Sequence, residues 1–381
     1  MKESLPSLLL GLTGMNIDGG IAVVSRCIVR ALDESIDHGE LGRADRVLFL
    51  DAPESVPQTP RRGQQYLSHG SKLRFIWQLW WSLMRVRPDL VFFDLTGLAR
   101  TVHLPLPGFP PDRYAIFAHG IELAGAESDS RGRAIRGAWR VLANSDFTAE
   151  GLRTQFPEVA DRIRVTPLCI DPALVEFWES QGSPPTKPEG PIALIVGRMW
   201  AEERGKGHDQ LLDIWPEVQS RVSGAVLWIV GEGNDRARLE EKARELGLAE
   251  HVRFWGRVTD EKLCDLYRRA AVFAMPSRQE GFGLVYAESM WHGLPCIGST
   301  ADAAGQVIRD GETGLLVPYD DRPALGEALV RILEDSDYCA RLGEAAARRA
   351  RDFFGYERFK DDVLRALEIG SEAIASKKSD G

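Results

Sequence analysis

The sequence has few of the residues that build metal or disulfide sites. Its 381 residues include five cysteines and seven histidines. No two cysteines lie close enough in sequence to form a metal-ligand pair, and the histidines form no HExxH or HxH pattern. An odd number of cysteines in mostly apolar surroundings indicates buried free thiols in a reducing compartment. We therefore expect no metal site.

Long apolar runs and an excess of positive charge are also absent. No stretch approaches the roughly 18 apolar residues that cross a bilayer, and we expect no signal peptide at the N-terminus. The net charge is −9, whereas nucleic-acid binding needs a strongly basic face. These absences argue against nucleic acid as a partner. They predict a cytoplasmic protein and leave contact with the inner membrane surface open.

Length and composition predict two domains. A chain of 381 residues with 44% hydrophobic content is too long for one ordinary domain and can fill two cores. Residues 181–191 contain four prolines, two glycines and no large apolar residue, which is typical of a linker. We expect an N-terminal domain over 1–180 and a C-terminal domain over 192–353. A last helix over 354–375 should return toward the N-terminal domain.

Short apolar strands alternate with helical segments in both halves. In the first half we expect strands at residues 7–12, 47–50, 90–94, 114–118, 141–145 and 164–168. In the second half we expect them at residues 192–196, 225–230, 252–255, 271–275, 294–298 and 313–317. This alternation predicts an α/β protein with two doubly wound, Rossmann-like parallel sheets.

The most informative stretch covers residues 276–293. A strand leads into a turn with Glu280, then Gly281-Phe282-Gly283, and then helical spacing from Leu284 that includes Glu288. A strand, a glycine turn and a helix start together present free backbone N–H groups to an anion. The two carboxylates on either side accept hydrogen bonds from hydroxyl groups. The combination suits a sugar nucleotide, which carries both phosphates and hydroxyls.

Two places in the first half carry weaker signals. Gly19 and Gly20 open a helix after the first strand, where a structural turn and a ligand loop are equally consistent with the sequence. His119 follows the strand at 114–118, at the end where open α/β sheets bind ligands. A buried histidine with satisfied hydrogen bonds is the alternative for His119, and position alone does not separate the two.

The helix expected over residues 72–87 is rich in tryptophan and arginine and has no acidic residue. Core packing in a βαβ unit is the first interpretation. The alternative is contact with a membrane interface or a lipid-linked substrate.

In order along the chain, these motifs resemble the family 4 retaining glycosyltransferases of GT-B fold, also described as glycosyl transferases group 1. The resemblance is dense from residue 192 to 317 and looser over 1–180. It rests on Glu280-Gly281-Phe282-Gly283-Leu284 with Glu288, Asp310-Gly311-Glu312-Thr313-Gly314, Val196-Gly197-Arg198, Lys206-Gly207, Val230-Gly231-Glu232-Gly233 and His119-Gly120-Ile121-Glu122.

The resemblance implies two Rossmann-like domains facing a central cleft that binds a nucleoside diphosphate sugar. Arg198 and Lys206 would hold the diphosphate, Glu288 the ribose and Glu280 the transferred sugar, with His119 nearby. Arg204 is close enough to Lys206 to compete for its role. The donor-binding residues implied are Gly19, Gly20, Arg198, Lys206, Gly256, Arg257, Val258, Glu280, Gly281, Phe282, Gly283, Leu284 and Glu288.

The resemblance further implies hexosyl transfer with retention, without a metal or another cofactor, to a saccharide or lipid-linked acceptor. Such enzymes commonly build polysaccharides and glycoconjugates. Other GT-B activities remain as alternatives, a sugar-nucleotide epimerase or a phosphorylase, although no pyridoxal-lysine site is evident. A non-catalytic sugar-nucleotide binder is another alternative. A nicotinamide dehydrogenase is disfavoured because Gly231-Glu232-Gly233 lacks the third glycine and the downstream acid.

Overall fold

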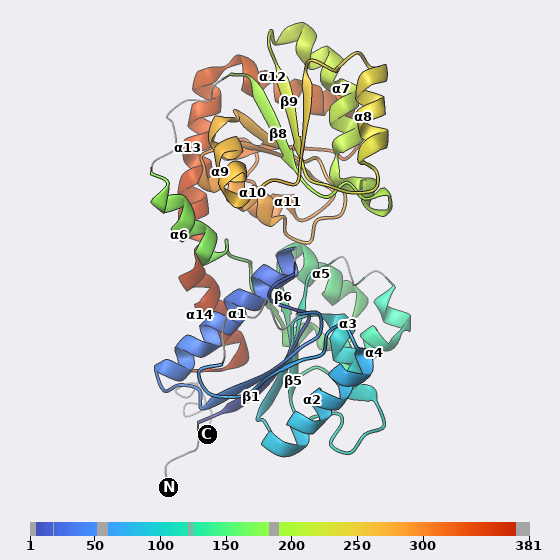
Figure 1. Cartoon of the computed structure of the whole chain (residues 1–381), viewed down its shortest axis with the longest axis vertical. Helices are drawn as coiled ribbons and strands as arrows, with labels where there is room; N and C mark the ends of the chain where they lie inside the picture. The colour runs from blue at the N-terminus through green and yellow to red at the C-terminus, as the bar shows by residue number, and fades with distance from the viewer. Residues whose placement is uncertain are drawn as a thin grey trace. The chain divides into compact units, whose positions relative to one another are not determined.

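The chain divides into two α/β units, each built on a parallel sheet (Figure 1). This computed structural model describes residues 5–17, 19–51, 60–120, 123, 125–182 and 190–370. The first unit takes the chain up to Asp171 and again from Tyr356, and the second takes Pro172–Gly355. Within these described ranges, no helix has the length and apolarity to cross a bilayer.

The first sheet has seven strands in the order β3-β2-β1-β4-β5-β6-β7, and neighbouring strands are parallel. Parallel strands need helical crossovers, which cover both faces of the sheet. The strands are β1 (Ser7–Leu12), β2 (Arg43–Leu48), β3 (Gln65–Leu67), β4 (Leu90–Phe93), β5 (Tyr114–Ala118), β6 (Arg140–Ala143) and β7 (Ile163–Val165).

On one face of this sheet, α1 lies beside the C-terminal helix α14 (Figure 1). Phe75, Leu79 and Leu83 of α2 pack into the hydrophobic core with residues of β1, β4 and β5. The helices of this unit are α1 (Gly20–Asp37), α2 (Lys72–Val86), α3 (Thr96–Ala99), α4 (Ser130–Gly137), α5 (Asp146–Gln155) and α14 (Tyr356–Leu367), with 3₁₀ helices at Arg100–His103, Ala126–Ser128 and Pro157–Arg162.

The strand β2 begins and ends earlier than predicted. The apolar signal lies at residues 47–50, but the strand starts at Arg43. Its charged residues are tolerated because they are paired: the buried Arg46 guanidinium bonds Asp33, and Arg43 bonds Asp45 at 2.8 Å. Apolar periodicity does not reveal such pairs, so the charged part of the strand resembles a loop in the sequence.

The second sheet has six parallel strands in the order β10-β9-β8-β11-β12-β13. They are β8 (Ile192–Val196), β9 (Val226–Val230), β10 (Val252–Gly256), β11 (Val272–Ala274), β12 (Cys296–Ser299) and β13 (Gly314–Val317). The helices are α6 (Pro172–Ser180), α7 (His208–Arg221), α8 (Arg236–Glu245), α9 (Asp260–Arg269), α10 (Leu284–Trp291), α11 (Ala304–Val307), α12 (Arg322–Glu334) and α13 (Ser336–Phe353), with a 3₁₀ helix, η6, at Ala201–Lys206.

The division between the units differs from the expected domain boundary. The second unit starts at Pro172 rather than after the linker expected at 181–191, and residues 183–189 of that linker lie outside the described residues. The physical reason is that α6 packs with residues of the second unit. Its Trp178 is buried, and the centre of its ring lies 4.6 Å from the centre of the His292 ring. At the other end, α14 stops at Leu367 although a helix is expected to residue 375. Residues 371–375 are not described.

Candidate active site

The second sheet reverses its strand order between β8 and β11. The strands β9 and β10 lie on one side of β8, and β11, β12 and β13 lie on the other. Open parallel sheets bind ligands at the carboxyl ends of their strands, where such a reversal leaves a crevice. Arg198 and Lys206 follow β8, and Glu280 follows β11. The topology therefore brings these three predicted residues to one edge of the sheet.

The loops after β8 and β11 contact each other. Gly207 has a φ of +100°, and a Cβ atom there would lie 2.6 Å from Cδ of Pro276, so this position requires glycine. Beside it, the Lys206 ammonium forms an ion pair with Glu280, with side chains 19% and 13% exposed. A cation and a carboxylate thus meet, largely shielded from water, at the point where the strand order reverses.

Arginines near Lys206 have other partners. Arg204 makes two hydrogen bonds to Asp235, at 2.7 and 3.0 Å. Arg198 pairs with Glu203 at 3.2 Å, and its side chain is 62% exposed. The structure therefore distinguishes Lys206 from Arg204: Lys206 faces Glu280, whereas Arg204 is held by the start of α8. Arg198 lies in the same loop but makes no contact with Glu280 among the described interactions.

Asp302 organises the turn that carries Glu280, and the sequence analysis missed it. Its buried carboxylate accepts hydrogen bonds from Ser277 Oγ, from Glu280 N–H at 3.1 Å and from Ala304 N–H at 2.9 Å. Burial raises its pKa to about 6. The only sequence signal is an aspartate just before a short alanine-rich helix, which also fits ordinary helix capping.

The helix α10 begins at the glycine turn without a side-chain cap. Gly283 has a φ of +84°, and a Cβ atom there would lie 2.5 Å from the ring of Tyr286. Uncapped helix starts leave backbone N–H groups and the positive end of the helix dipole available to an anion. Phe282 is buried edge-on against Phe354, with ring centres 5.8 Å apart, so only its backbone can reach a ligand. Gly281 is buried and Leu284 is half-buried.

Glu288 lies in the second turn of α10. Its carboxylate accepts a hydrogen bond from the Tyr267 hydroxyl at 3.3 Å. Tyr267 is buried on α9, and its ring stacks on His292 at 5.3 Å. Burial and the neighbouring Glu288 raise the pKa of Tyr267 well above its usual value, so its hydroxyl stays a donor. Tyr267 is a second residue that the sequence analysis missed.

The turn at Gly256, Arg257 and Val258 packs on the neighbouring loop after β9. Gly256 has a φ of +70°, and the Arg257 N–H donates to Oε1 of Glu232 at 3.2 Å. In the same region, a Cβ atom on Gly231 would lie 2.0 Å from the carbonyl oxygen of Gly197. The glycine at position 231 is therefore needed for close backbone packing of the β8 and β9 loops.

In the first unit, His119 lies at the carboxyl end of β5. Its Nε2–H donates to the carbonyl oxygen of Asp94 at 2.8 Å, and its own carbonyl accepts from Asn144 Nδ2 at 3.0 Å. Gly19 has a φ of +119° and precedes α1, which starts at Gly20 without a side-chain cap. His119, Gly19 and Gly20 thus lie at one edge of the first sheet, and the other predicted site residues belong to the second unit.

Asp94 joins the elements around this edge. Its fully buried carboxylate accepts from Thr13 N–H at 2.7 Å, from Thr13 Oγ1 at 3.0 Å and from Ser25 Oγ at 2.7 Å. Burial raises its pKa to about 6, against an ordinary value of 3.8.

The raised pKa of Asp94 makes stability depend on pH. An acid whose pKa is higher in the folded protein stabilises the fold most below its ordinary pKa, and this contribution is lost as the pH rises through about 6. We expect the free energy of unfolding of the native protein minus that of Asp94→Asn to fall by about 2 kcal/mol between about pH 4 and about pH 7. Urea denaturation across this range measures it. A difference that stays constant or grows with pH would contradict the burial argument.

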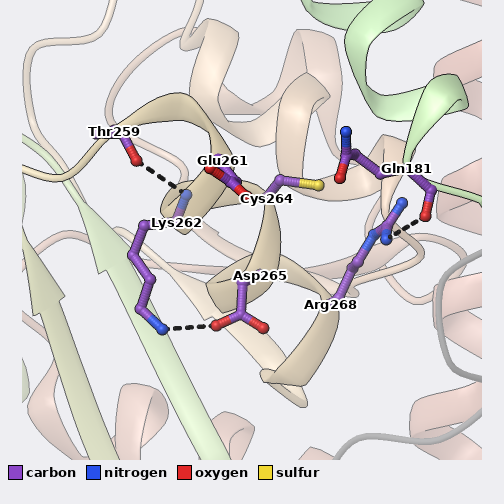
Figure 2. A pocket seen from close by; sticks show the side chains of 7 residues that line it. All are labelled: Gln181, Thr259, Glu261, Lys262, Cys264, Asp265 and Arg268. Atoms are coloured by element: carbon purple, nitrogen blue, oxygen red, sulfur yellow. Dashed lines mark hydrogen bonds and ion pairs between the residues drawn. The ribbon is translucent and has the colours of Figure 1, made fainter.

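A cavity of about 440 Å³ lies beside α9, and none of the predicted site residues lines it, although its Thr259 directly follows Val258 (Figure 2). Its polar groups are largely paired with one another, for example Lys262 with Asp265 at 2.6 Å and Arg268 with the carbonyl of Gln181 at 3.1 Å.

All five cysteines are buried free thiols. In the part of the chain that the structure describes, no three His, Cys, Asp or Glu side chains are grouped to hold a metal ion.

Two protein-family models match the chain, one in each half. The model described as Glycosyltransferase Family 4 matches residues 19–174, and the model described as Glycosyl transferases group 1 matches residues 190–335. The chain belongs to the family 4, group 1 glycosyltransferases. The predicted family is confirmed.

Curated members of this glycosyltransferase family resemble part of the chain. A phosphatidyl-myo-inositol mannosyltransferase of Mycobacterium leprae is 39% identical over 165 residues, which are 43% of this chain and 43% of the relative. A D-inositol 3-phosphate glycosyltransferase of Streptomyces coelicolor is 38% identical over 148 residues, 38% of this chain and 32% of the relative. The match thus spans less than half the length of these relatives.

Solved structures share the fold over nearly the whole chain. Sucrose-phosphate synthase from Thermosynechococcus elongatus has a TM-score of 0.75 at 23% identity, covering 95% of this chain and 98% of its own. HepE of Anabaena, in complex with UDP, has a TM-score of 0.72 at 18% identity, covering 95% and 99%. With the two parallel sheets, these likenesses confirm the predicted GT-B fold class of doubly wound α/β units.

Proposed function

We propose that this protein transfers a hexose from a nucleoside diphosphate sugar to a saccharide or lipid-linked acceptor, with retention of configuration and without a metal or another cofactor. The observation that carries the proposal is the shielded Lys206–Glu280 pair beside the uncapped start of α10. There a cation and helix N–H groups can meet a diphosphate, and a carboxylate can meet sugar hydroxyls.

In this proposal the donor lies along the start of α10. The N–H groups of Gly283 and Leu284 and the ammonium of Lys206 bind the diphosphate, and Arg198 turns from Glu203 to add a second cation. Glu280 binds hydroxyls of the transferred sugar. The buried Asp302 acts as a positioning residue, because it fixes the backbone of Glu280.

The nucleoside half of the donor would extend toward α9. Glu288 accepts hydrogen bonds from the ribose hydroxyls, and Tyr267 holds that carboxylate in place. The turn of Gly256, Arg257 and Val258 lies by the base. Because Arg257 N–H already donates to Glu232 and the Gly256 carbonyl accepts from Gly231 N–H at 2.9 Å, the carbonyl group of Val258 is the better candidate for a base contact.

His119, Gly19 and Gly20, which lie at one edge of the first sheet, are assigned to the acceptor side. In a retaining transfer the acceptor attacks from the face that the diphosphate leaves, and the leaving phosphate takes the acceptor proton. Catalysis then depends on positioning and on stabilising the departing charge by Lys206 and Arg198. These two cations take the role that a metal ion fills in other transferases.

The names of the curated relatives support a lipid-linked or inositol-containing acceptor, since they include phosphatidyl-myo-inositol and D-inositol 3-phosphate. We place the enzyme in the cytoplasm, at the inner membrane face, in glycoconjugate or polysaccharide synthesis. The donor base is left to experiment, because one relative is named as GDP-mannose-dependent and the HepE structure holds UDP.

Thermal-shift measurements with UDP, GDP, ADP and their sugars test the donor site. A ligand at about 100 times its Kd that binds only the folded state adds about 2.7 kcal/mol of stability. We expect one nucleotide series to raise Tm by several degrees and the other two to have little effect. No shift with any series would contradict the proposal. Incubation with the sugar nucleotide alone then checks for an epimerised product, which would indicate the epimerase instead.

A further inference from the structure

The outer face of α2 exposes a row of large apolar side chains. Leu73, Trp77, Trp81 and Met84 are 80%, 57%, 46% and 42% exposed. Their spacing of four, four and three residues puts them on one side of the helix. Trp77 and Trp81 stack with ring centres 6.0 Å apart and planes within 8°. A continuous apolar strip of this kind on a protein surface marks an interaction site.

Folding does not need this strip. The opposite side of α2 already supplies Phe75, Leu79 and Leu83 to the hydrophobic core. The helix is thus apolar on two faces, whereas a surface helix normally has one apolar and one polar face. Exposing two tryptophans brings no packing benefit, so the strip indicates a partner.

A short loop extends the apolar surface beside the C-terminal half of α2. The indole N–H of Trp80 donates to the carbonyl of Pro107 at 3.0 Å, and a Cβ atom on Gly108 would lie 3.0 Å from the sulfur of Met84. Pro105, Pro107 and Pro110 in this loop are exposed. The strip and the loop together form one apolar surface on the first unit.

The charged side chains that α2 contributes around this surface are all positive. Lys72, Arg74, Arg85 and Arg87 are exposed and lie at the two ends of α2, which has no acidic residue. Arg85 bonds the neutral side chain of Gln64 at 2.9 Å. The whole chain carries a net charge of −9, so a basic rim here is a local exception. It complements an anionic partner.

We propose that α2 docks this protein on an anionic lipid surface. Stacked tryptophans in an apolar strip with lysine and arginine at its margins are the composition of helices that lie in the membrane interface. Each basic side chain adds attraction to anionic headgroups. With 15 residues, α2 lies on the bilayer surface rather than crossing it.

Docking through α2 would also present the acceptor edge of the first sheet to the membrane. Because β3 ends just before α2 starts, the first turn of α2 lies at the carboxyl edge of the sheet, where His119 and Gly19 also lie. A lipid-linked acceptor in the same membrane would meet that edge. This last step rests on the proposed transferase function, whereas the docking itself does not.

Co-sedimentation of the full chain with vesicles at low salt tests the docking. We expect binding to phosphatidylcholine mixed with phosphatidylglycerol and at least about tenfold less binding to phosphatidylcholine alone. The double variant Trp77→Ser/Trp81→Ser and the double variant Lys72→Ser/Arg74→Ser should each lower binding to the anionic vesicles about tenfold. Leu246→Ser, which changes an exposed leucine of the second unit, is the matched control and should bind like the native protein.

Native-like binding by both double variants, or no binding to anionic vesicles, would overturn the proposal. A concentration-dependent dimer that Trp77→Ser/Trp81→Ser dissolves would also overturn it, because a second copy would then cover the strip. The nucleotide-induced rise in Tm should be the same in all variants. This readout separates loss of docking from loss of the fold or of the proposed donor site.

Discussion

Replacing Lys206 by Ala is expected to lower kcat/KM for sugar transfer by about 10²- to 10³-fold, which is the usual effect of removing one group that stabilises developing charge in a shielded site. Lys206 is the cation that meets Glu280 at the start of α10, and its side chain is only 19% exposed. Its loss leaves the departing diphosphate with only helix N–H groups and Arg198. Initial rates of nucleoside diphosphate release with acceptor present provide the measurement.

The matched control is Arg204→Ala in the same 3₁₀ helix. Arg204 is also a paired cation, but its partner is Asp235. We expect its removal to change kcat/KM by less than about threefold, because Arg204 makes no contact with Glu280 among the described interactions and Asp235 keeps its ion pair with Arg238 at 2.7 Å. Equal losses in the two variants would mean that the loop, and not the Lys206 ammonium, supports activity. Full activity of Lys206→Ala would contradict the assignment of this site.

Replacing Glu288 by Ala is expected to weaken binding of the preferred nucleoside diphosphate by about 10- to 100-fold, since hydrogen bonds to a charged group contribute about 1.5–3 kcal/mol. Glu288 is the acceptor proposed for the ribose hydroxyls, and Tyr267 bonds it from behind. Isothermal titration calorimetry measures the affinity. The variant should stay folded, because Glu288 is only partly buried.

Tyr267→Phe separates the positioning role from the binding role. It keeps the ring stacked on His292 but removes the hydroxyl that holds Glu288. We expect a smaller loss than for Glu288→Ala, about three- to tenfold in nucleotide affinity, with kcat little changed. Unchanged affinity in Glu288→Ala would rule out the ribose assignment. A larger loss in Tyr267→Phe than in Glu288→Ala would indicate that disturbed packing, and not the carboxylate, decides the affinity.

Much of the second unit can be predicted because its signals are local in sequence. The strand before residue 276, the glycine turn at Gly283 and the helix that follows are adjacent, and each has a characteristic residue pattern. The alternation of strands and helices predicts a doubly wound parallel sheet, but the strand order that brings Lys206 to Glu280 comes from the structure. Family membership and the GT-B fold class follow from the same ordered motifs.

The supporting residues of the site cannot be predicted in this way. Asp302 meets Glu280 and Ser277 only after β12 has paired with β11, and Tyr267 meets Glu288 only after α9 has packed on α10. Neither contact has a fixed sequence spacing. The same holds for the buried ion pair of Arg46 with Asp33. Because this pair is not evident from the sequence, the charged start of β2 resembles a loop there.

The helix α2 shows a different limit of prediction from the sequence. Its composition fits both core packing and membrane contact, and the sequence does not say which residues face which side. The structure assigns Phe75, Leu79 and Leu83 to the core and leaves Trp77 and Trp81 outside. Both interpretations thus apply to different faces of one helix.

A crystal structure of the full chain with the nucleoside diphosphate selected by thermal shift would test the central claim most directly. We predict that the diphosphate oxygens lie within hydrogen-bond distance of the backbone nitrogens of Gly283 and Leu284 and of Lys206 Nζ, with the ribose hydroxyls on Glu288. A nucleotide bound without contact to the start of α10, for example in the cavity beside α9, would contradict the account.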